Sequence, residues 1–240
     1  MQFDINYTWS KSIDNVSVTA NTVATGGYGF VCDINRPREC RAPSDFDNRQ
    51  MISGNIIYEL PFGRGKSFAN TVPLWADEVI GGWSLSALPY WRTGFPYFAT
   101  SSAFVAGYAN NAPAVLSGNP SALAASPHKD AAGKVWMYKD VDAALTSYSA
   151  PTGFNIGSRN NLYGLHYTNV DLGLGKYFAI YKDRAKLQFR CDAFNAFNHP
   201  TFSTPGTSQK DITQSSGLFG QISGTDSTAR VLQGSLRLEF

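Results

Sequence analysis

The side chains best suited to redox or nucleophilic chemistry in this sequence are three cysteines. Cys32 and Cys40 lie close together in the segment CDINRPREC, which the alternating pattern described below places in a loop. In an oxidising location outside the cell, such a pair favours a disulfide that closes the loop, and two free thiols are the alternative. A thiol count after denaturation distinguishes the disulfide from two free thiols. Cys191 lies on the apolar side of an alternating segment and is expected to be an inert, small hydrophobic residue.

Histidine and acidic residues give no pattern typical of a metal or catalytic site. His128, His166 and His199 are far apart in sequence, and neither His-x3-His nor Cys-x2-Cys spacing occurs. Asp45 and Asp47 offer only two carboxylates in a segment without the EF-hand pattern, so that solvation at the surface is favoured over Ca²⁺ binding. No Gly-x-Ser-x-Gly elbow is present. We therefore predict no enzyme activity, no cofactor and no metal site.

Composition excludes other partner classes. The 240 residues carry a net charge of +2 without a basic run, a P-loop or a dinucleotide-binding glycine motif, so no nucleic acid is expected as a partner. Charged residues make up 16% of the chain and aromatic residues 14%, whereas soluble domains typically contain about 25% charged residues. Because no run of about 18 apolar residues occurs, a membrane-spanning helix is excluded. Membrane-spanning strands are not, since their alternation is lost in hydropathy averages.

Alternation of apolar and polar residues is the main structural signal, and it recurs in six segments. The connections between these segments are alternately long and short, which is typical of a transmembrane barrel with long outer loops and short periplasmic turns. The predicted fold is all-β, an antiparallel up-and-down meander of about six transmembrane strands. Bacterial barrels begin at about eight strands, so this meander is expected to be an incomplete segment of a larger outer-membrane β-barrel. The segments are residues 2–10, 50–60, 81–94, 169–178, 186–194 and 230–240.

A soluble extracellular β-sandwich that binds glycans is the alternative, because alternating strands also build sandwiches whose apolar face is a core. Structureless loops beyond about 15 residues are rare in compact soluble domains, and this favours the barrel. A sandwich is expected to purify without detergent, whereas the barrel segment needs detergent and partitions with outer membranes. A barrel enzyme is a third class, for which the sequence offers no catalytic set.

The strand pattern predicts which medium or which neighbours several polar and aromatic side chains contact. Six charged residues fall on the polar face, where they are expected to face a water-filled lumen and to pair across strands rather than to contact cargo. Trp136 and Tyr138, between the third and fourth segments, either contact a ligand or cover a small core of their own loop. The six charged residues are Arg92, Asp171, Arg190, Asp192, Arg237 and Glu239.

The segment CDAFNAFNHPTF, residues 191–202, places aromatic rings beside amides where the fifth alternating segment ends. Aromatic rings favour the boundary between hydrocarbon and headgroups, so two girdles are expected, one at each end of the strands. Phe194 and Phe197 are expected in the outer girdle. Their polar neighbours, expected at the aqueous boundary, are Asn195, Asn198 and His199.

Five motifs follow one another in a characteristic order. They are YTWSKSIDN from Tyr7, DFDNRQMISGNIIYELPFGRGK from Asp45, GGWSLSALPYWRTGFPY from Gly81, GSRNNLYGLHYTNVDLGLGKYF from Gly157 and LQFRCDAFNAFNHPTF from Leu187. Together they resemble the C-terminal part of TonB-dependent outer-membrane receptors. The chain is most similar to the Oar-like subgroup, whose members carry an N-terminal carboxypeptidase-regulatory-like domain. ELPFGRGK and FNAFNHPTF are the most specific pieces of this resemblance, which spans most of the chain.

The resemblance implies energised import across the outer membrane. In this family a barrel of about 22 strands, plugged by an N-terminal domain and opened by TonB, takes up a scarce ligand. The sequence contains neither a plug nor a TonB box, so residues 1–240 are interpreted as the C-terminal portion of a receptor barrel. Siderophores, cobalamin, oligosaccharides and peptides are all carried by members of the family, and the sequence does not select among them.

The same resemblance implies a location and partners. The location is the cell outer membrane, and the partners are outer-membrane lipid, the remaining barrel strands and the plug, and the TonB complex, which contacts the N-terminal part. The barrel-assembly machinery reads an aromatic last residue in such barrels, and Phe240 fits that role.

Overall fold

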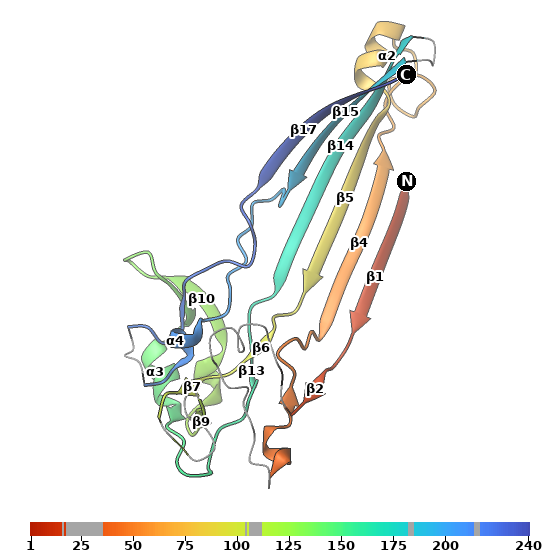
Figure 1. Ribbon diagram of the computed structural model, residues 1–240. Helices are drawn as coiled ribbons and strands as arrows, with labels where there is room; N and C mark the ends of the chain where they lie inside the picture. The colour runs from red at the N-terminus through yellow and green to blue at the C-terminus, as the bar shows by residue number, and fades with distance from the viewer. Residues whose placement is uncertain (16, 18–35, 104, 106–111, 182–184, 214–216) are drawn as a thin grey trace.

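A computed structural model describes residues 1–15, 17, 36–103, 105, 112–181, 185–213 and 217–240. Its largest element is a six-stranded antiparallel sheet in the order β1-β4-β5-β14-β15-β17 (Figure 1). Each of these strands pairs with the next one along the chain, as an up-and-down meander requires, and each corresponds to one of the six alternating segments. The strands are β1 (Gln2–Trp9), β4 (Gln50–Glu59), β5 (Trp83–Arg92), β14 (Tyr167–Tyr181), β15 (Ala185–Phe194) and β17 (Val231–Glu239).

The connections give the two ends of the sheet different surroundings. Residues 10–49, 93–166 and 195–230 join strands at one end, here called the long-loop end. Residues 60–82 and 182–184 join them at the other, the short-turn end, where the C-terminus also lies (Figure 1). The predicted alternation of long and short connections is confirmed. One of the shorter connections contains a helix, α2 (Leu74–Ile80), that the sequence analysis did not predict.

Strand register defines an apolar face, because residues directly opposite each other on paired strands point to the same side of a sheet. Leu172, for example, pairs with Ala87 on β5 and with Ala193 on β15. The pairing carries the predicted apolar positions of all six strands onto this one face. Representatives from β1 to β17 are Ile5, Ile56, Leu85, Leu172, Phe189 and Leu236.

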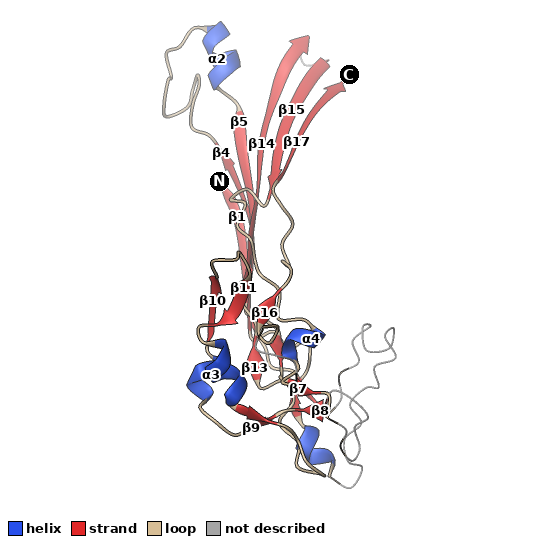
Figure 2. Ribbon diagram, turned by 90° about the vertical axis from the view of Figure 1, so that its left-hand side faces the viewer, coloured by secondary structure: helices blue, strands red, loops and turns tan. Residues whose placement is uncertain are grey.

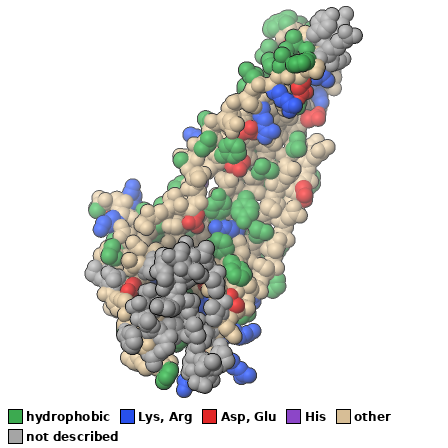
Figure 3. Space-filling model, viewed as in Figure 1, with side chains coloured by type: hydrophobic (Ala, Val, Ile, Leu, Met, Phe, Trp, Pro, Cys, Tyr) green, Lys and Arg blue, Asp and Glu red, His purple; other side chains and the backbone are tan. Residues whose placement is uncertain are grey.

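The opposite, polar face carries hydroxyl, amide and charged side chains. Figure 3 shows Lys, Arg, Asp and Glu side chains gathered over the sheet toward its short-turn end. The face is not purely polar, since Ile57, Leu88 and Phe194 also lie on it. All six charged residues expected to share this face do so by register: Arg92, Asp171, Arg190, Asp192, Arg237 and Glu239.

Pro89 lies within β5, a central strand, although proline cannot donate a ladder hydrogen bond. Pairing of β4 with β5 is interrupted between the Ser53–Tyr90 and Ile56–Ala87 pairs, and it keeps the same register on either side. Gly54 lies opposite the proline, and a Cβ atom there would stand 3.1 Å from Pro89 Cγ. The glycine therefore leaves space for the ring at the one place where the ladder is broken.

The connections at the long-loop end fold into a layer of short elements, the loop domain (Figures 1 and 2). A three-stranded sheet in the order β10-β11-β16 is its largest unit, and four two-stranded ladders surround it. The strands are β2 (Ile13–Asp14), β3 (Ala42–Pro43), β6 (Pro96–Tyr97), β7 (Thr100–Ser101), β8 (Ala112–Pro113), β9 (Val115–Leu116), β10 (Ala125–Lys129), β11 (Val135–Tyr138), β12 (Tyr148–Ser149), β13 (Leu162–Tyr163) and β16 (Gln221–Ile222). The helices are η1 (Pro37–Cys40), η2 (Pro120–Leu123), α3 (Val141–Thr146) and α4 (Thr207–Lys210).

The buried apolar core of the described residues lies in the loop domain. Its largest cluster joins Met137 and Tyr138 of β11 to Ala144 of α3 and to Phe219 and Ile222. These side chains come from two different connections, 93–166 and 195–230, so the two fold together as one unit. None of the buried hydrophobic side chains belongs to the six long strands.

The long sheet is open. Within the described part of the chain, β1 and β17 each pair with a single long strand, so both edges expose backbone N–H and C=O groups. Among the helices of the described residues, none is both long enough and apolar enough to cross a bilayer.

Candidate functional site

The apolar face of the long sheet is a large uncovered surface. Ile5 is 59% exposed and Leu236 is 69% exposed. Among the described residues only the helix α2, at the short-turn end, packs over this face, and no second sheet does. A soluble sandwich buries its apolar face against another sheet, and the soluble-sandwich alternative therefore lacks its core here. A continuous apolar surface of this kind marks contact with another apolar medium.

Aromatic residues flank this surface at both ends, as expected. Tyr7 and Trp9 end β1 at the long-loop end, and Tyr58 and Trp83 lie at the short-turn end. One expected member of the outer girdle is misplaced, however. Phe194 pairs with Val231 and shares the polar face with Asp192, because two residues along a strand return to the same side.

The charged side chains of the polar face pair along their strands, whereas the sequence analysis expected pairs between strands. Arg190 Nε lies 2.8 Å from Asp192 Oδ2, and Arg237 Nε lies 3.5 Å from Glu239 Oε1. Side chains two apart on one strand share a face, and both pairs use this geometry. Arg92 instead stacks over an aromatic ring, with its guanidinium carbon 4.0 Å from the centroid of Phe95.

The FNAFN motif is a turn that ends β15. Asn195 and Asn198 both have positive φ, 47° and 49°, which asparagine tolerates better than most residues. Asn195 N–H donates to Asp171 Oδ1 at 2.8 Å, and its side-chain amide donates to Thr228 O at 2.8 Å. Asn195 is only 6% exposed. It therefore does not meet the aqueous boundary as expected, because its polar groups are used to join β14, β15 and the segment before β17.

A buried arginine joins two of the long connections at the base of the loop domain. Arg159 is nearly fully buried and forms ion pairs with Asp14 and with Asp45, the latter at 3.3 Å. Ser17 Oγ accepts a third hydrogen bond from its guanidinium at 3.0 Å. Asn160, the next residue, donates to Asp45 Oδ1 at 2.6 Å. We call these residues the loop anchor.

A further carboxylate, that of Asp47, lies beside the loop anchor. Asp47 is fully buried and accepts hydrogen bonds from Ser12 N–H at 2.6 Å and from Tyr163 OH at 3.2 Å. Arg49 Nε lies 2.8 Å from the same carboxylate. The expectation that Asp45 and Asp47 are surface residues is therefore wrong for Asp47. Its charge is compensated by Arg49 and by these two further donors, as buried carboxylates require.

Trp136 and Tyr138 lie in the core of the loop domain. Tyr138 is 2% exposed, stacks on Phe219 with ring centroids 5.7 Å apart, and shares a 3.0 Å hydrogen bond with Tyr97 OH. Trp136 Nε1 donates to Asp130 Oδ2 at 2.9 Å. Burial raises the pKa of the Tyr97, Tyr138 and Tyr148 hydroxyls, which therefore stay protonated. This environment favours the second of the two roles considered for Trp136 and Tyr138, covering the loop's own core.

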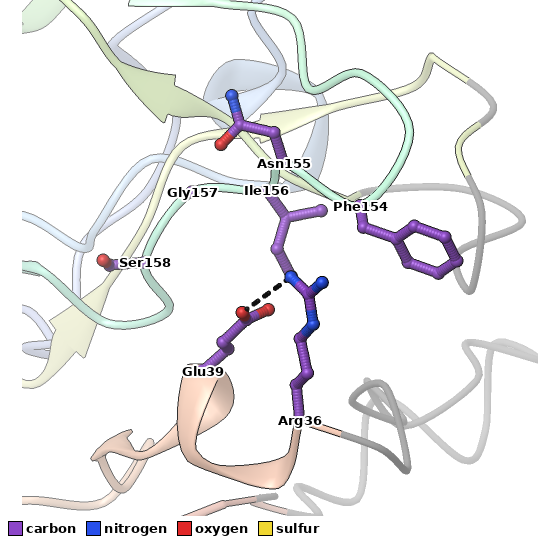
Figure 4. Close-up of a pocket in the computed structure, with 7 residues that line it drawn as sticks. All are labelled: Arg36, Glu39, Phe154, Asn155, Ile156, Gly157 and Ser158. Carbon is purple, nitrogen blue, oxygen red and sulfur yellow. Dashed lines mark hydrogen bonds and ion pairs between the residues drawn. The ribbon is translucent and has the colours of Figure 1, made fainter.

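A cavity of about 380 Å³ opens between η1 and the segment that follows β12 (Figure 4). Arg36 and Glu39 lie on one side and form an ion pair at 3.3 Å. Phe154 and Asn155 lie on the other side, and the backbone of Gly157 completes the wall. Because the two charges of the lining compensate each other, the cavity does not indicate one class of ligand.

The remaining candidate residues are the cysteines, the potential metal ligands and Phe240, and the structure describes some of them and not others. Cys32 and the side chain of Cys40 lie outside the described residues, so the disulfide stays a prediction. Cys191 lies on the apolar face opposite Leu174 and Gly234. In the described parts of the chain, no three His, Cys, Asp or Glu side chains are grouped as ligands for a metal ion. Phe240 is fully exposed after β17, and its role in assembly stays a prediction.

A buried lysine of the sheet was not among the residues predicted from the sequence. Lys176 pairs with Trp83 and with Phe189, which places it on the apolar face. It is 3% exposed, because α2 covers it and Glu78 O accepts a hydrogen bond from its ammonium group. The alternation of β14 assigns position 176 to this face, and this was the signal available in the sequence.

An antiparallel meander with one lipid-compatible face, one polar face and aromatic residues at both ends defines a transmembrane β-sheet of the barrel type. The sequence matches the family model described as outer membrane beta barrel domain over residues 1–233. The chain belongs to this family, and its location is the outer membrane. No curated protein and no solved structure matches it. The long-loop end accordingly faces outward, and the short-turn end faces the periplasm.

Proposed function

We propose that this chain is the C-terminal portion of a TonB-dependent receptor of the Oar-like type, which imports a scarce ligand with energy from TonB. The observation that carries the proposal is the charged polar face of the sheet. Arg190, Asp192, Arg237 and Glu239 lie on it as ion pairs along the strands. Ion pairs on this face fit a polar barrel interior and not hydrocarbon, and wide barrels enclose an aqueous or plugged interior of this kind.

The open edges of the sheet support the assignment to a larger barrel. Unpaired N–H and C=O groups of β1 and β17 would each cost several kcal/mol in hydrocarbon, so further strands must cover them. We propose that the remaining strands and the plug of the receptor supply these contacts, that the TonB complex acts through the N-terminal part, and that the barrel-assembly machinery reads Phe240. The chain itself has no catalytic role in this proposal.

The loop anchor supports the resemblance on which the proposal rests. Three of the motifs that carry the resemblance meet there, contributing Asp14, Asp45 and Arg159. Their common purpose is to hold the outer loops together over the mouth of the barrel, where a receptor first meets its ligand.

Uptake in cells tests the proposal. The complete reading frame, including any coding sequence upstream of Met1, is expressed in paired strains with and without TonB. Accumulation of labelled siderophores, cobalamin, oligosaccharides and peptides is then compared. TonB-dependent accumulation of one of these supports import. Equal accumulation in both strains, at a rate proportional to concentration, indicates a passive pore and contradicts the proposal.

A second experiment uses the chain alone. Residues 1–240 refolded in detergent and added to a planar bilayer are expected to give no ion-conducting pore, because six strands do not close a barrel. Stable single-channel currents from the isolated chain would show that it closes without further strands.

A further inference from the structure

The helix α2 carries an exposed apolar surface that the strands do not explain. Leu74, Trp75 and Val79 point away from the protein, and Trp75 is 75% exposed. No residue of α2 is buried. Phe62 and Phe68, in the turn before the helix, are also exposed, with ring centroids 5.6 Å apart. Exposed aromatic and aliphatic residues grouped on one short helix and its turn indicate a surface that contacts another apolar phase.

The helix is held on the lipid-facing side of the sheet. Trp83 and Lys176 form a pair on the apolar face, and both donate hydrogen bonds to carbonyls in the last turn of α2. Trp83 Nε1 donates to Val79 O at 2.8 Å, and the Lys176 ammonium donates to Glu78 O. Since both donors lie outside the lumen, α2 lies outside the lumen as well. Figure 2 shows it beside the strands, at the end farthest from the loop domain.

Lys176 gives α2 a defined position rather than a loose one. Its ammonium group lies 5.4 Å from the ring centroid of Trp83 and 4.8 Å from that of Phe178. A lysine on a lipid-facing strand is tolerated near the interface but not at the midplane, and carbonyls at a helix C-terminus favour a cation. The covered lysine therefore places α2 at the level of the headgroups.

The turn before the helix fixes its orientation. Asp77 Oδ1 accepts a hydrogen bond from Arg64 N–H at 2.6 Å. Gly63 has φ of 114°, and a Cβ atom there would stand 2.5 Å from Asp77 Oδ1. The hydrogen bond holds the Asp77 side of α2 against the turn, and the absence of a side chain at Gly63 permits this close approach. The opposite side, with Trp75, is thereby directed away from the protein.

We propose that α2, with Phe62 and Phe68, is a membrane-surface element that inserts Leu74, Trp75 and Val79 into the headgroup–acyl boundary of the periplasmic phospholipid leaflet. The exposed surface of α2 continues the lipid-facing surface of the strands, and Trp and Phe at this depth are typical of interfacial helices. The inference depends on membership of the outer-membrane barrel family and not on the proposed import activity.

Depth-dependent quenching tests the proposal. Cys32→Ser, Cys40→Ser and Cys191→Ala remove the native thiols, and Trp75→Cys introduces a site for an environment-sensitive fluorophore. The protein expressed from its complete reading frame is reconstituted into vesicles of phosphatidylethanolamine and phosphatidylglycerol that carry a nitroxide either near the headgroup or near the end of the acyl chain. Matched controls are Leu236→Cys on the apolar face and Asp171→Cys on the polar face.

The label at position 75 is expected to be quenched more strongly by the shallow nitroxide than by the deep one and to be protected from aqueous iodide. The label at position 236 is expected to be quenched by the nitroxides on the lipid. The label at position 171 is expected not to be quenched by them. Lipid quenching at 236 but not at 75, with iodide access at 75, places α2 in water and overturns the proposal. Protection from iodide at 75 without lipid quenching means that protein covers α2, which also overturns it. Absence of lipid quenching at both positions overturns the lipid-facing assignment of the sheet together with the proposal.

Discussion

Arg159, which is buried, forms an ion pair with the partly exposed Asp14, although 145 positions separate them in the sequence. Their contact brings the connection after β1 together with the connection after β5, directly above the long-loop end of the sheet. Asp45 accepts a further hydrogen bond from the same guanidinium. The connections that form the loop domain are therefore held to one another by charge pairing as well as by the apolar core.

Replacing this arginine should loosen the loop domain and leave the sheet intact. Arg159→Met removes the only cation in contact with Asp14 and Asp45 within the described loop anchor. Removing one partner of a fully buried ion pair costs about 3–5 kcal/mol, and the cost is expected to be smaller here because both carboxylates are partly exposed. Limited proteolysis of the protein expressed from its complete reading frame, in isolated outer membranes, is expected to cleave residues 93–166 faster in the variant. The strand fragments should remain protected.

Lys66→Met is the matched control for this experiment. Lys66 pairs with Glu59 at 3.3 Å, and both side chains are largely exposed, so losing this pair should cost less than about 1 kcal/mol. Equal cleavage of the loop domain in Arg159→Met and Lys66→Met would show that the loop anchor does not hold it.

The loop anchor should also weaken in acid. Burial alone raises the pKa of Asp14, but hydrogen bonds from Ser17, Ser44 and Arg159 together with the charge of Arg159 lower it below its ordinary value of 3.8. A carboxylate whose pKa is lower in the folded state stabilises that state above its unfolded pKa. The stabilisation is lost as the pH falls through the folded-state pKa.

Hydrogen exchange of the loop domain measures this effect. Protection is expected to be constant above about pH 5 and to fall below the ordinary pKa of 3.8. In Asp14→Asn, protection is expected to be lower at neutral pH and to depend less on acid. A variant that is as sensitive to acid as the unchanged chain would assign the titration to another carboxylate, such as Asp211, whose pKa is also lowered.

The long strands could be predicted from the sequence, because the signal that defines them is local. A period of two places Leu172 and Leu174 on one face whatever the rest of the chain does. The same rule places Asp171 on the other face, as the register confirms. Side-chain direction could thus be predicted for the sheet. The prediction for Phe194 is wrong because the period of two places this ring on the polar face with Asp192, although aromatic residues favour the lipid interface.

Contacts between distant segments could not be predicted in this way. The contact between Lys176 and Glu78 spans 98 residues, and nothing in either local sequence indicates the other. The burial of Asp47 likewise depends on Tyr163, which comes from a different connection. A polar residue in a loop is solvated by default, and only the packing of two connections overturns that expectation here.

The turn at Asn195 should be sensitive to substitution for two separable reasons. Asn195→Ala loses the hydrogen bonds to Thr228 O and from His199 N–H, and it places a Cβ-bearing residue without a polar side chain at φ 47°. The expected loss of unfolding free energy is about 2–3 kcal/mol. Asn195→Gly removes the strain but not the loss of hydrogen bonds, so its loss should be smaller. Urea titration in detergent measures both, and equal losses would show that backbone strain contributes nothing.

The assignment of the two faces predicts opposite responses to the same substitution on one strand. Leu236→Arg places a charge on the apolar face of β17. A charged side chain that faces lipid is destabilising, by up to about 2–4 kcal/mol at the bilayer midplane and by less toward the interface. Gln233→Arg places the same charge on the polar face, opposite Asp192, where a cross-strand pair of opposite charge is slightly stabilising. The quantity to compare is the amount of each variant recovered in the outer-membrane fraction. Loss of Leu236→Arg with retention of Gln233→Arg is expected, because only the first buries an unpaired charge in hydrocarbon. If the two variants insert equally well, the apolar face does not contact lipid, because hydrocarbon would penalise the arginine at position 236 and not the arginine at position 233.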